Sequence, residues 1–530
     1  MSTVALSSLK GRWVMVGTIM ASSMAFIDAT ALNVALPALQ SDFHATSSEL
    51  FWILNAYLLM LSSLILIGGS LGDKIGRKRI FMLGILIFII GSAACGFSQN
   101  VLSLIIFRMI QGIGGSLMIP GSLALISSSI NEVERGKAIG TWSAVTTVVS
   151  VGGPILGGGL ADIGLWKYIF FINVPIGVFT LIVLATNVNE VKSDKMDKSI
   201  DFVGAITVVS GLAALTFSFL SMPAKGIYSW QVSLALIIGI ILLIGFVRIE
   251  QRAKHPMMPM SIFKNGTFSG VNLLTLFLYA GLGGGMLFLS LNLVQAQGYS
   301  QFESGLTILP FSILMILLSR YIGKLSDKYG ARMFLILGPI ITGTGFMMLA
   351  SIKQTYGSGE YFNTFFPGIF VFGLGMAITV VPLTKTVMSS VGDQLSGTAS
   401  GINNATAQMS NVFAYAIFGA LAVFFFSSGM ESRLANSKLP SDARKLIVSE
   451  AINLGNAQVP ATVQESDRAQ IAAFYKESFI DSYKNVMQIS GMLCIAGAFM
   501  TIIFIKKKSV RDAPEGSKSI FNKDYDKIRY

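Results

Sequence analysis

The stretch Gly69-Ser-Leu-Gly-Asp-Lys-Ile-Gly-Arg-Lys-Arg79 lies between two long apolar runs and decides the fold. Its glycines allow a sharp turn, and its basic end is typical of a loop that stays in the cytoplasm. A fainter copy downstream, Gly323-Lys-Leu-Ser-Asp-Lys-Tyr-Gly-Ala-Arg332, repeats glycine, aspartate and glycine at the same spacing. Such an internal repeat indicates a duplicated membrane-spanning unit.

The composition indicates a helical protein that crosses the membrane many times. Of the 530 residues, 53% are hydrophobic and only 12% are charged, and the mean hydropathy is +0.67. A soluble protein usually has about 25% charged residues. The first apolar run is long enough to span a bilayer, so we expect no cleavable signal.

The apolar runs predict an all-α protein with fourteen transmembrane helices. They are expected at residues 13–35, 50–71, 80–98, 101–126, 137–160, 168–187, 202–222, 229–247, 267–296, 303–322, 333–352, 365–390, 399–427 and 484–505. The first copy of the Gly-Asp-Gly turn follows the second helix, and the second copy follows the tenth. This register predicts two six-helix halves with two helices inserted between them, the plan of facilitator-type transporters.

The same register predicts the domain boundaries. They are an N-terminus over 1–12, a first half over 13–187, the inserted helices and their linkers over 188–266, a second half over 267–505 that includes an extracellular segment 428–483, and a basic tail over 506–530.

Lysine and arginine are concentrated in alternate connecting segments, while the short outer loops between them hold only Lys167, Lys225 and Lys353. The basic segments are therefore expected in the cytoplasm, together with both termini. This predicts a multi-pass protein of the cytoplasmic (inner) membrane, embedded in the lipid bilayer. The net charge of +12 then reflects topology, and no nucleic-acid partner is expected because no soluble domain carries the basic residues.

The side chains that support enzymatic or metal chemistry are scarce. Two cysteines, Cys95 and Cys494, lie in apolar runs, and the only histidines are His44 and His255. They offer no disulfide framework and no metal or haem site. No phosphate-binding loop of the Gly-x4-Gly-Lys-Ser/Thr type occurs. We therefore expect no cofactor, no metal and no enzymatic activity, and any transport is expected to use an ion gradient.

Ionisable residues inside membrane spans are costly and indicate function. Asp28 is the only acidic residue well within a predicted span, and Arg108 is the clear basic one. Each lies about 7 residues from the outer end of its span, on the order of 10 Å deep. We expect both in one outward vestibule, where Asp28 binds a proton. The alternatives are a permanent structural ion pair and an Arg108 that caps backbone carbonyls. Lys385, near a cytoplasmic end, is expected to snorkel to the interface.

Glycine and proline are dense in the fifth span, at Gly153, Pro154, Gly157 and Gly158. Proline frees a backbone carbonyl, and glycines allow close approach and bending. Two interpretations are open, a flexing interface and plain tight packing.

The segment 428–483 is long and polar for an outer connection. Ser441 is expected to cap a helix over 442–453 that ends at Gly455, and Thr462 and Glu465 have the spacing of a capping box that starts a second helix, continuous with the last span. Two roles are open, a surface hairpin that only joins two spans and an element for gating or for contact with an adaptor.

These residues resemble a known family, the major facilitator superfamily. Gly69 to Lys78 resembles its motif A, Arg108 to Gly115 its motif B, and Gly140 to Gly158 its motif C, which is associated with antiporters. Asp28 to Pro37, with Trp166 to Gly177 and Gly298 to Pro310, is similar to motifs of the fourteen-helix drug:proton antiporter branch.

The resemblance implies roles for matching residues. Asp73, Arg77 and Arg135, with Asp327 of the second copy, would form a gating charge cluster, and Arg108 would be linked to proton transfer. Gly153, Pro154, Gly157 and Gly158 would shape the interface between halves. Val149 departs from the usual glycine of motif C.

The helices that bind cationic drugs in some members lack extra carboxylates here, which argues against dicationic substrates. The expected substrate cavity is lined by Asp28, Asn33, Asn55, Gln111, Asn292, Asn403, Asn404 and Gln408.

The sequence thus predicts a monomeric proton-coupled exporter, an antiporter of lipophilic drugs or amphiphilic small molecules that works by alternating access and serves in multidrug efflux and drug resistance. One alternative is a dedicated exporter of a single endogenous metabolite, siderophore or lipid. Another is a membrane sensor that does not transport.

Overall fold

The computed structural model describes residues 4–190, 201–254, 256, 258–391, 395–435, 437 and 439–505, with the backbone alone at residues 73, 396 and 397. His255, the basic residues of 191–200 and the basic tail 506–530 lie outside the described residues. Within them, fourteen helices are long and apolar enough to cross a membrane, which confirms the predicted number of spans. The same residues form no strand, only one isolated bridge between Val4 and Ile130.

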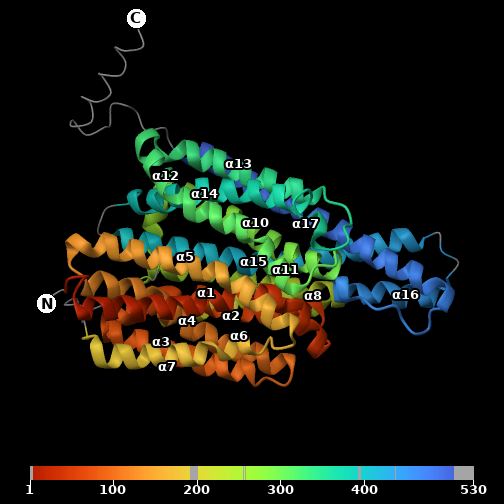
Figure 1. The fold of residues 1–530 in the computed structure, drawn as a ribbon, viewed down its shortest axis with the longest axis horizontal. Coiled ribbons are helices and arrows are strands. Elements are labelled where there is room, and N and C mark those ends of the chain that lie inside the picture. Colours follow the sequence, from red (N-terminus) through yellow and green to blue (C-terminus); the bar gives the residue numbers. More distant parts are fainter. Residues whose placement is uncertain are drawn as a thin grey trace, which may run out of the picture.

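The first half and the inserted pair follow one another along the chain (Figure 1). The helices are α1 (Leu9–Phe43), α2 (Ser47–Ile75), α3 (Arg77–Gly96), α4 (Val101–Ser129), α5 (Glu132–Asp162), α6 (Tyr168–Phe171), α7 (Asn173–Asn187), α8 (Phe202–Lys225) and α9 (Trp230–Arg252). The short α6 and α7 together form the sixth span.

The second half also consists of helices joined by short connections, and it has a longer connection before its last helix. Its elements are η1 (Met260–Lys264), α10 (Gly266–Gln295), α11 (Gln301–Thr307), α12 (Leu309–Tyr329), α13 (Ala331–Ala350), η2 (Ser358–Glu360), α14 (Phe365–Ser389), α15 (Ser396–Leu434), α16 (Ser441–Ser449), η4 (Glu450–Asn456) and α17 (Glu465–Phe504). The α11 and α12 helices together form the tenth span.

The repeated Gly-Asp-Gly stretch makes a sharp turn in both halves. Gly76 joins α2 to α3 with φ 128°, and Gly330 joins α12 to α13 with φ 84°. Side chains other than glycine rarely adopt such positive φ values. The predicted turn is therefore confirmed at both copies.

The two halves meet along several helix pairs. In the first half α4 packs against α2 and α3, and α1 packs against α5; in the second half α17 packs against α10 and α13. Between the halves, α2 contacts α15, α5 contacts α11, and α1 contacts α10. The inserted α8 lies against both α2 and α15, so it covers one of the seams between the halves.

Residues 435–464 join α15 to α17 and are called the cap. Figure 1 shows the cap, with α16, projecting from one end of the bundle, opposite the first described residues. We call this the cap end. Gln40 at the end of α1 donates to the Asn453 carbonyl oxygen (3.2 Å), and its Oε1 accepts from Gln295 of α10 and Asn456, both at 2.9 Å. The cap is thus tied to both halves.

The helices of the cap differ in detail from those predicted. Ser441 is the first residue of α16, not its cap, and a 3-10 helix runs on through the expected end at Gly455. The kink lies at Leu454 (φ 50°), which is buried with Ile447 in the core of the cap, so packing overrides the helix signals. A turn from Pro460 to Val463 holds Thr462 outside α17, so the predicted capping box is wrong. The α17 helix does run unbroken into the last span, as expected.

Candidate functional site

Asp28 of α1 and Arg108 of α4 form a direct ion pair inside the first half. The Arg108 Nη1 lies 2.5 Å from the Asp28 Oδ2, and the two side chains are 1% and 0% exposed. Sequence reasoning placed both at one depth, and the structure brings them together. It does not place them in an open vestibule, because neighbouring helices cover both side chains completely.

The polar atoms around this pair are satisfied. Gln111, one turn after Arg108, accepts from Arg108 Nη1 and donates to Asp28 Oδ1, both at 2.8 Å. Arg108 Nε donates to the carbonyl oxygen of Ile53 (3.4 Å), and its guanidinium lies 4.4 Å from the ring centre of Tyr57. A buried ion pair is stable only when such hydrogen bonds satisfy the remaining donors and acceptors. We call Asp28, Arg108 and Gln111 the buried triad.

The glycine-rich part of α5 lies one turn of α1 away from the triad. A side chain at Gly153 or Gly157 would collide with Thr30 or Ala31 of α1. On the next face, a side chain at Gly158 would meet the Gln301 carbonyl oxygen of the other half. The α5 helix therefore packs between α1 and α11, and its glycines allow close contact with both helices.

Side-chain hydrogen bonds that the sequence did not predict also join α5 to α11. Asp162, the last residue of α5, accepts the backbone N–H groups of Gln301 (2.8 Å) and Phe302 (2.9 Å) at the start of α11. A carboxylate at a helix N-terminus satisfies unpaired N–H groups and interacts favourably with the helix dipole. No local spacing connects residues so far apart in the chain. At the cap end, this seam between the halves is closed.

The predicted cavity residues do not gather in one compact pocket. Asn403 of α15 donates to Asn272 (3.2 Å) and Thr275 (2.7 Å) near the start of α10, whereas Asn292 lies near the other end of that helix. Twenty residues of helix separate Asn272 and Asn292, which is about 30 Å. The set therefore extends over roughly the thickness of a bilayer core.

Two of these amides are poorly satisfied. Asn55 and Asn292 are fully buried, and neither side-chain oxygen nor nitrogen has a hydrogen-bond partner among the described atoms. Asn33 is half-buried beside the Tyr415 hydroxyl. Buried amides without partners are costly, and they are available to a bound molecule. Asn404 is exposed and Gln408 is half-buried.

Of the residues expected in the charge cluster, Arg77 begins α3 and Arg135 lies in the first turn of α5. Arg77 Nη1 donates to the Ala124 carbonyl oxygen (3.2 Å), and Arg135 has a buried Nε without a partner among the described atoms. The side chain of Asp73 lies outside the described atoms. Glu190, which sequence reasoning missed, accepts the backbone N–H groups of Lys78 and Arg79, each at 3.1 Å.

In the second half, Asp327 is bound within its own half. Both its carboxylate oxygens lie 2.8 Å from Lys385 Nζ, which also donates to the Gly323 carbonyl oxygen. Lys385 was expected only to snorkel; its side chain is 45% exposed but makes this specific pair. The pair links α12 to α14 across the second copy of the repeated turn.

Comparisons with known proteins point to one family. A family model described as the Major Facilitator Superfamily matches residues 18–415. The chain is 27% identical over 513 residues to the tetracenomycin C resistance and export protein of Streptomyces glaucescens, covering 96% of this chain and 95% of that protein. It is 28% identical over 530 residues to the multidrug transporter protein MdtP of Bacillus subtilis, covering 95% of each.

A shorter match has higher identity. The methylenomycin A resistance protein of Bacillus subtilis is 31% identical over 402 residues, covering 75% of this chain and 84% of that protein. Among solved structures, a bacterial homologue of the human lysosomal transporter Spinster superposes with a TM-score of 0.65 at 16% identity, covering 94% of this chain and 98% of that one. At this identity the likeness supports the fold alone.

Proposed function

Since this chain belongs to the major facilitator superfamily, a family of multi-pass membrane transporters of small molecules, we propose that it is a proton-coupled exporter of lipophilic or amphiphilic compounds. It exchanges protons for substrate by alternating access. The observation that carries the proposal is the buried triad, an acidic side chain deep in a span whose two oxygens are held by Arg108 and Gln111.

Protonation of Asp28 changes the energy of the whole triad. It removes the negative charge that faces the Arg108 guanidinium, and a buried charge that loses its partner costs about 3–5 kcal/mol. Moving a two-state equilibrium from 1:99 to 99:1 takes about 5.5 kcal/mol. The cost of breaking this pair is therefore of the same order as the free energy needed to change conformation.

A short series of contacts connects the buried triad to the α5–α11 seam. Thr30 and Ala31 follow Asp28 within one turn of α1 and pack against Gly153 and Gly157 of α5. The same helix closes on α11 through Gly158. A shift of α1 that accompanies protonation is thereby passed to the contact that holds the cap end closed.

The orientation follows from charge. The turns with Arg77 and Lys328 lie opposite the cap, and basic loops remain in the cytoplasm. We therefore place both termini in the cytoplasm, the cap outside, and the protein in the cytoplasmic membrane. The structure then corresponds to a state closed to the outside.

A dedicated exporter is the second candidate. One relative is named for the resistance to and export of a single compound, tetracenomycin C, and another for multidrug transport. Of the two deeply buried acids in the described spans, Asp28 is paired with Arg108 and Glu250 accepts the backbone N–H of Met258 (3.0 Å). This favours neutral or singly charged compounds over dications in either case.

The test is substrate-induced proton release from purified protein at a defined pH, with a panel of neutral, monocationic and monoanionic lipophilic compounds. Wild type is expected to release protons with at least one compound, and Asp28→Asn is expected to release none because the titrating group is gone. Asp442→Asn, an exposed aspartate of α16, serves as the matched control and is expected to behave as wild type. Undiminished release by Asp28→Asn would reject the role of Asp28.

A further inference from the structure

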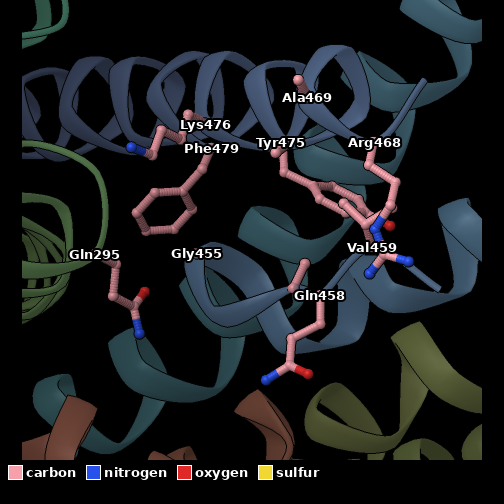
Figure 2. Close-up of a pocket in the computed structure, with 11 residues that line it drawn as sticks. Gln295, Gly455, Gln458, Val459, Arg468, Ala469, Tyr475, Lys476 and Phe479 are labelled. Carbon is pink, nitrogen blue, oxygen red and sulfur yellow. The ribbon is translucent and has the colours of Figure 1, made fainter. Parts of the chain in front are cut away.

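We propose that a pocket between the cap and the start of α17, called the cap pocket, binds an amphiphile with one acidic head group, and that its occupant is a molecule leaving the transporter. Only the origin of the occupant rests on the proposed export function. The site is a cavity of about 490 Å³ between the first turns of α17 and the segment from Gly455 to Val459 (Figure 2). Small-molecule sites commonly have such volumes.

The walls of the cavity are apolar and rigid. Tyr475 and Phe479 of α17 line it together with Ala457, Val459 and Ala472. Both rings pack on Phe426 of α15, with centroid distances of 6.1 and 6.3 Å. The Tyr475 hydroxyl donates to the Ile447 carbonyl oxygen (2.9 Å), so the ring presents only its apolar body to the cavity. Such a surface suits a hydrocarbon chain or ring system.

The charges around the cavity are of one sign. Arg468 and Lys476 both line it, and none of its lining residues is acidic. Figure 2 shows Arg468 beside Gln458 and Val459 at one end, and Lys476 close to Phe479 at the other. Two cations beside an apolar wall recognise an anionic head group on an apolar body.

The acids of α17 do not neutralise these cations, and Glu450, which lines the adjoining cavity together with Arg468, accepts a hydrogen bond from Asn453 Nδ2 (2.8 Å). Glu477 and Asp481 on the same helix bind Arg433 of α15, at 3.1 and 2.7 Å. Glu465 approaches Arg468 only to 3.8 Å and its side chain is 94% exposed. Such surface pairs contribute little, so the cavity keeps a net positive lining.

A polar group completes the site from the membrane side. Gln295, at the end of α10, lines the cavity, and its Oε1 is buried without a hydrogen-bond partner among the described atoms. Its Nε2 donates to Gln40 of the first half (2.9 Å), which fixes the amide. The free oxygen can accept a hydrogen bond from a hydroxyl group of the bound molecule.

The cavity continues towards the seam between the halves. Gln458, Val459 and Arg468 also line a larger cavity of about 1070 Å³. That cavity is bounded by Pro37 of α1 in the first half and Gln301 in the second. A molecule released between the halves at this end reaches the cap pocket directly, and we therefore assign the pocket to the exported molecule.

The test measures binding of a fluorescent fatty acid, 11-(dansylamino)undecanoic acid, to the full chain in nanodiscs of zwitterionic lipid. Its uncharged methyl ester is the second probe. Arg468→Gln with Lys476→Gln is expected to weaken binding of the acid about tenfold or more, and to leave the ester unchanged. Lys445→Gln with Lys484→Gln removes the same charge from exposed residues outside the pocket and is expected to bind the acid as wild type.

The outcomes separate the site from the transport mechanism. Unchanged affinity of the acid in the Arg468 and Lys476 double variant would overturn the site, provided that its Tm matches wild type. Displacement of the acid by phosphatidylglycerol in the nanodisc, and not by soluble decanoate, would overturn the assignment to an exported molecule. Asp28→Asn is expected to bind the acid normally while losing proton release, so failure of the proposed function leaves this measurement intact.

Discussion

At the scale of single residues, Arg108 is a buried charged side chain that partners on three helices hold in place. It is among the largest fully buried side chains, and it reaches partners on α1, α2 and α4 at once. A lysine could not reproduce this geometry, because one ammonium group lacks the planar fork that binds several acceptors. The triad therefore ties three helices together, and in the proposed function it is also the group that takes up the proton.

We expect Arg108→Met to destabilise the protein by about 3–5 kcal/mol, because Asp28 is left as an unpaired buried charge. Combining it with Asp28→Asn is expected to recover a large part of that loss, since no charge remains buried. Thermal unfolding of the four proteins in detergent measures the cycle. Additive losses in the double variant would show that the two side chains do not act as a pair.

At the scale of elements, α5 carries the contact between halves. Its glycines meet backbone atoms of α1 and α11, and Asp162 at its end caps α11. Small residues allow helices to approach closely inside a membrane. In this state the helices pack tightly at the glycines of α5, as one of the two interpretations predicts. The proposed alternating access requires the same seam to open.

Two glycines of α5 offer a matched test. Gly158→Ala is expected to lower export about tenfold, because the added methyl group meets the Gln301 carbonyl oxygen and overpacking costs about 1–3 kcal/mol. Gly152 has no atom within 4 Å of an added methyl group. Gly152→Ala is expected to keep export and to raise Tm slightly, since alanine is the better helix former by roughly 1 kcal/mol. Export assays on both variants decide, and equal effects would argue against the seam.

At the scale of the whole molecule, several separate contacts hold the two halves together at the cap end. The α5–α11 seam closes it on one side, and the bonds of Gln40 to Gln295 and Asn456 close it through the cap. The inserted α8 covers the α2–α15 seam. Alternating access requires the first two ties to break and form again in each cycle.

Cross-linking tests this directly. A side chain at Gly159 lies against the ring of Phe302 across the halves. The double variant Gly159→Cys with Phe302→Cys is expected to form a disulfide that holds the cap end closed. Export is expected to fall at least tenfold and to return when a reductant is added, while either single variant stays active. The native Cys95 and Cys494 are buried and do not compete. Full export with the disulfide intact would contradict alternating access at this seam.

The sequence by itself determined the fold class and singled out the two buried charged residues of the proposed site. Fourteen apolar runs predicted fourteen spans, and the repeated glycines predicted the turns at Gly76 and Gly330. Rarity inside the spans singled out Asp28 and Arg108. These features depend on local hydropathy, backbone freedom and the cost of buried charge, all of which can be read from residue types in order.

Only the tertiary structure decided which side chains meet. The direct pairing of Asp28 with Arg108, the bond between Asp327 and Lys385, and the cap of α11 by Asp162 join residues that are 80, 58 and 139 positions apart. No local spacing encodes such contacts, because they arise when whole helices pack. The apolar pocket of the cap depends in the same way on α17 folding back over residues 455–459. In the cap, the packing of the buried Leu454 and Ile447 outweighed the local signals for the start and end of a helix.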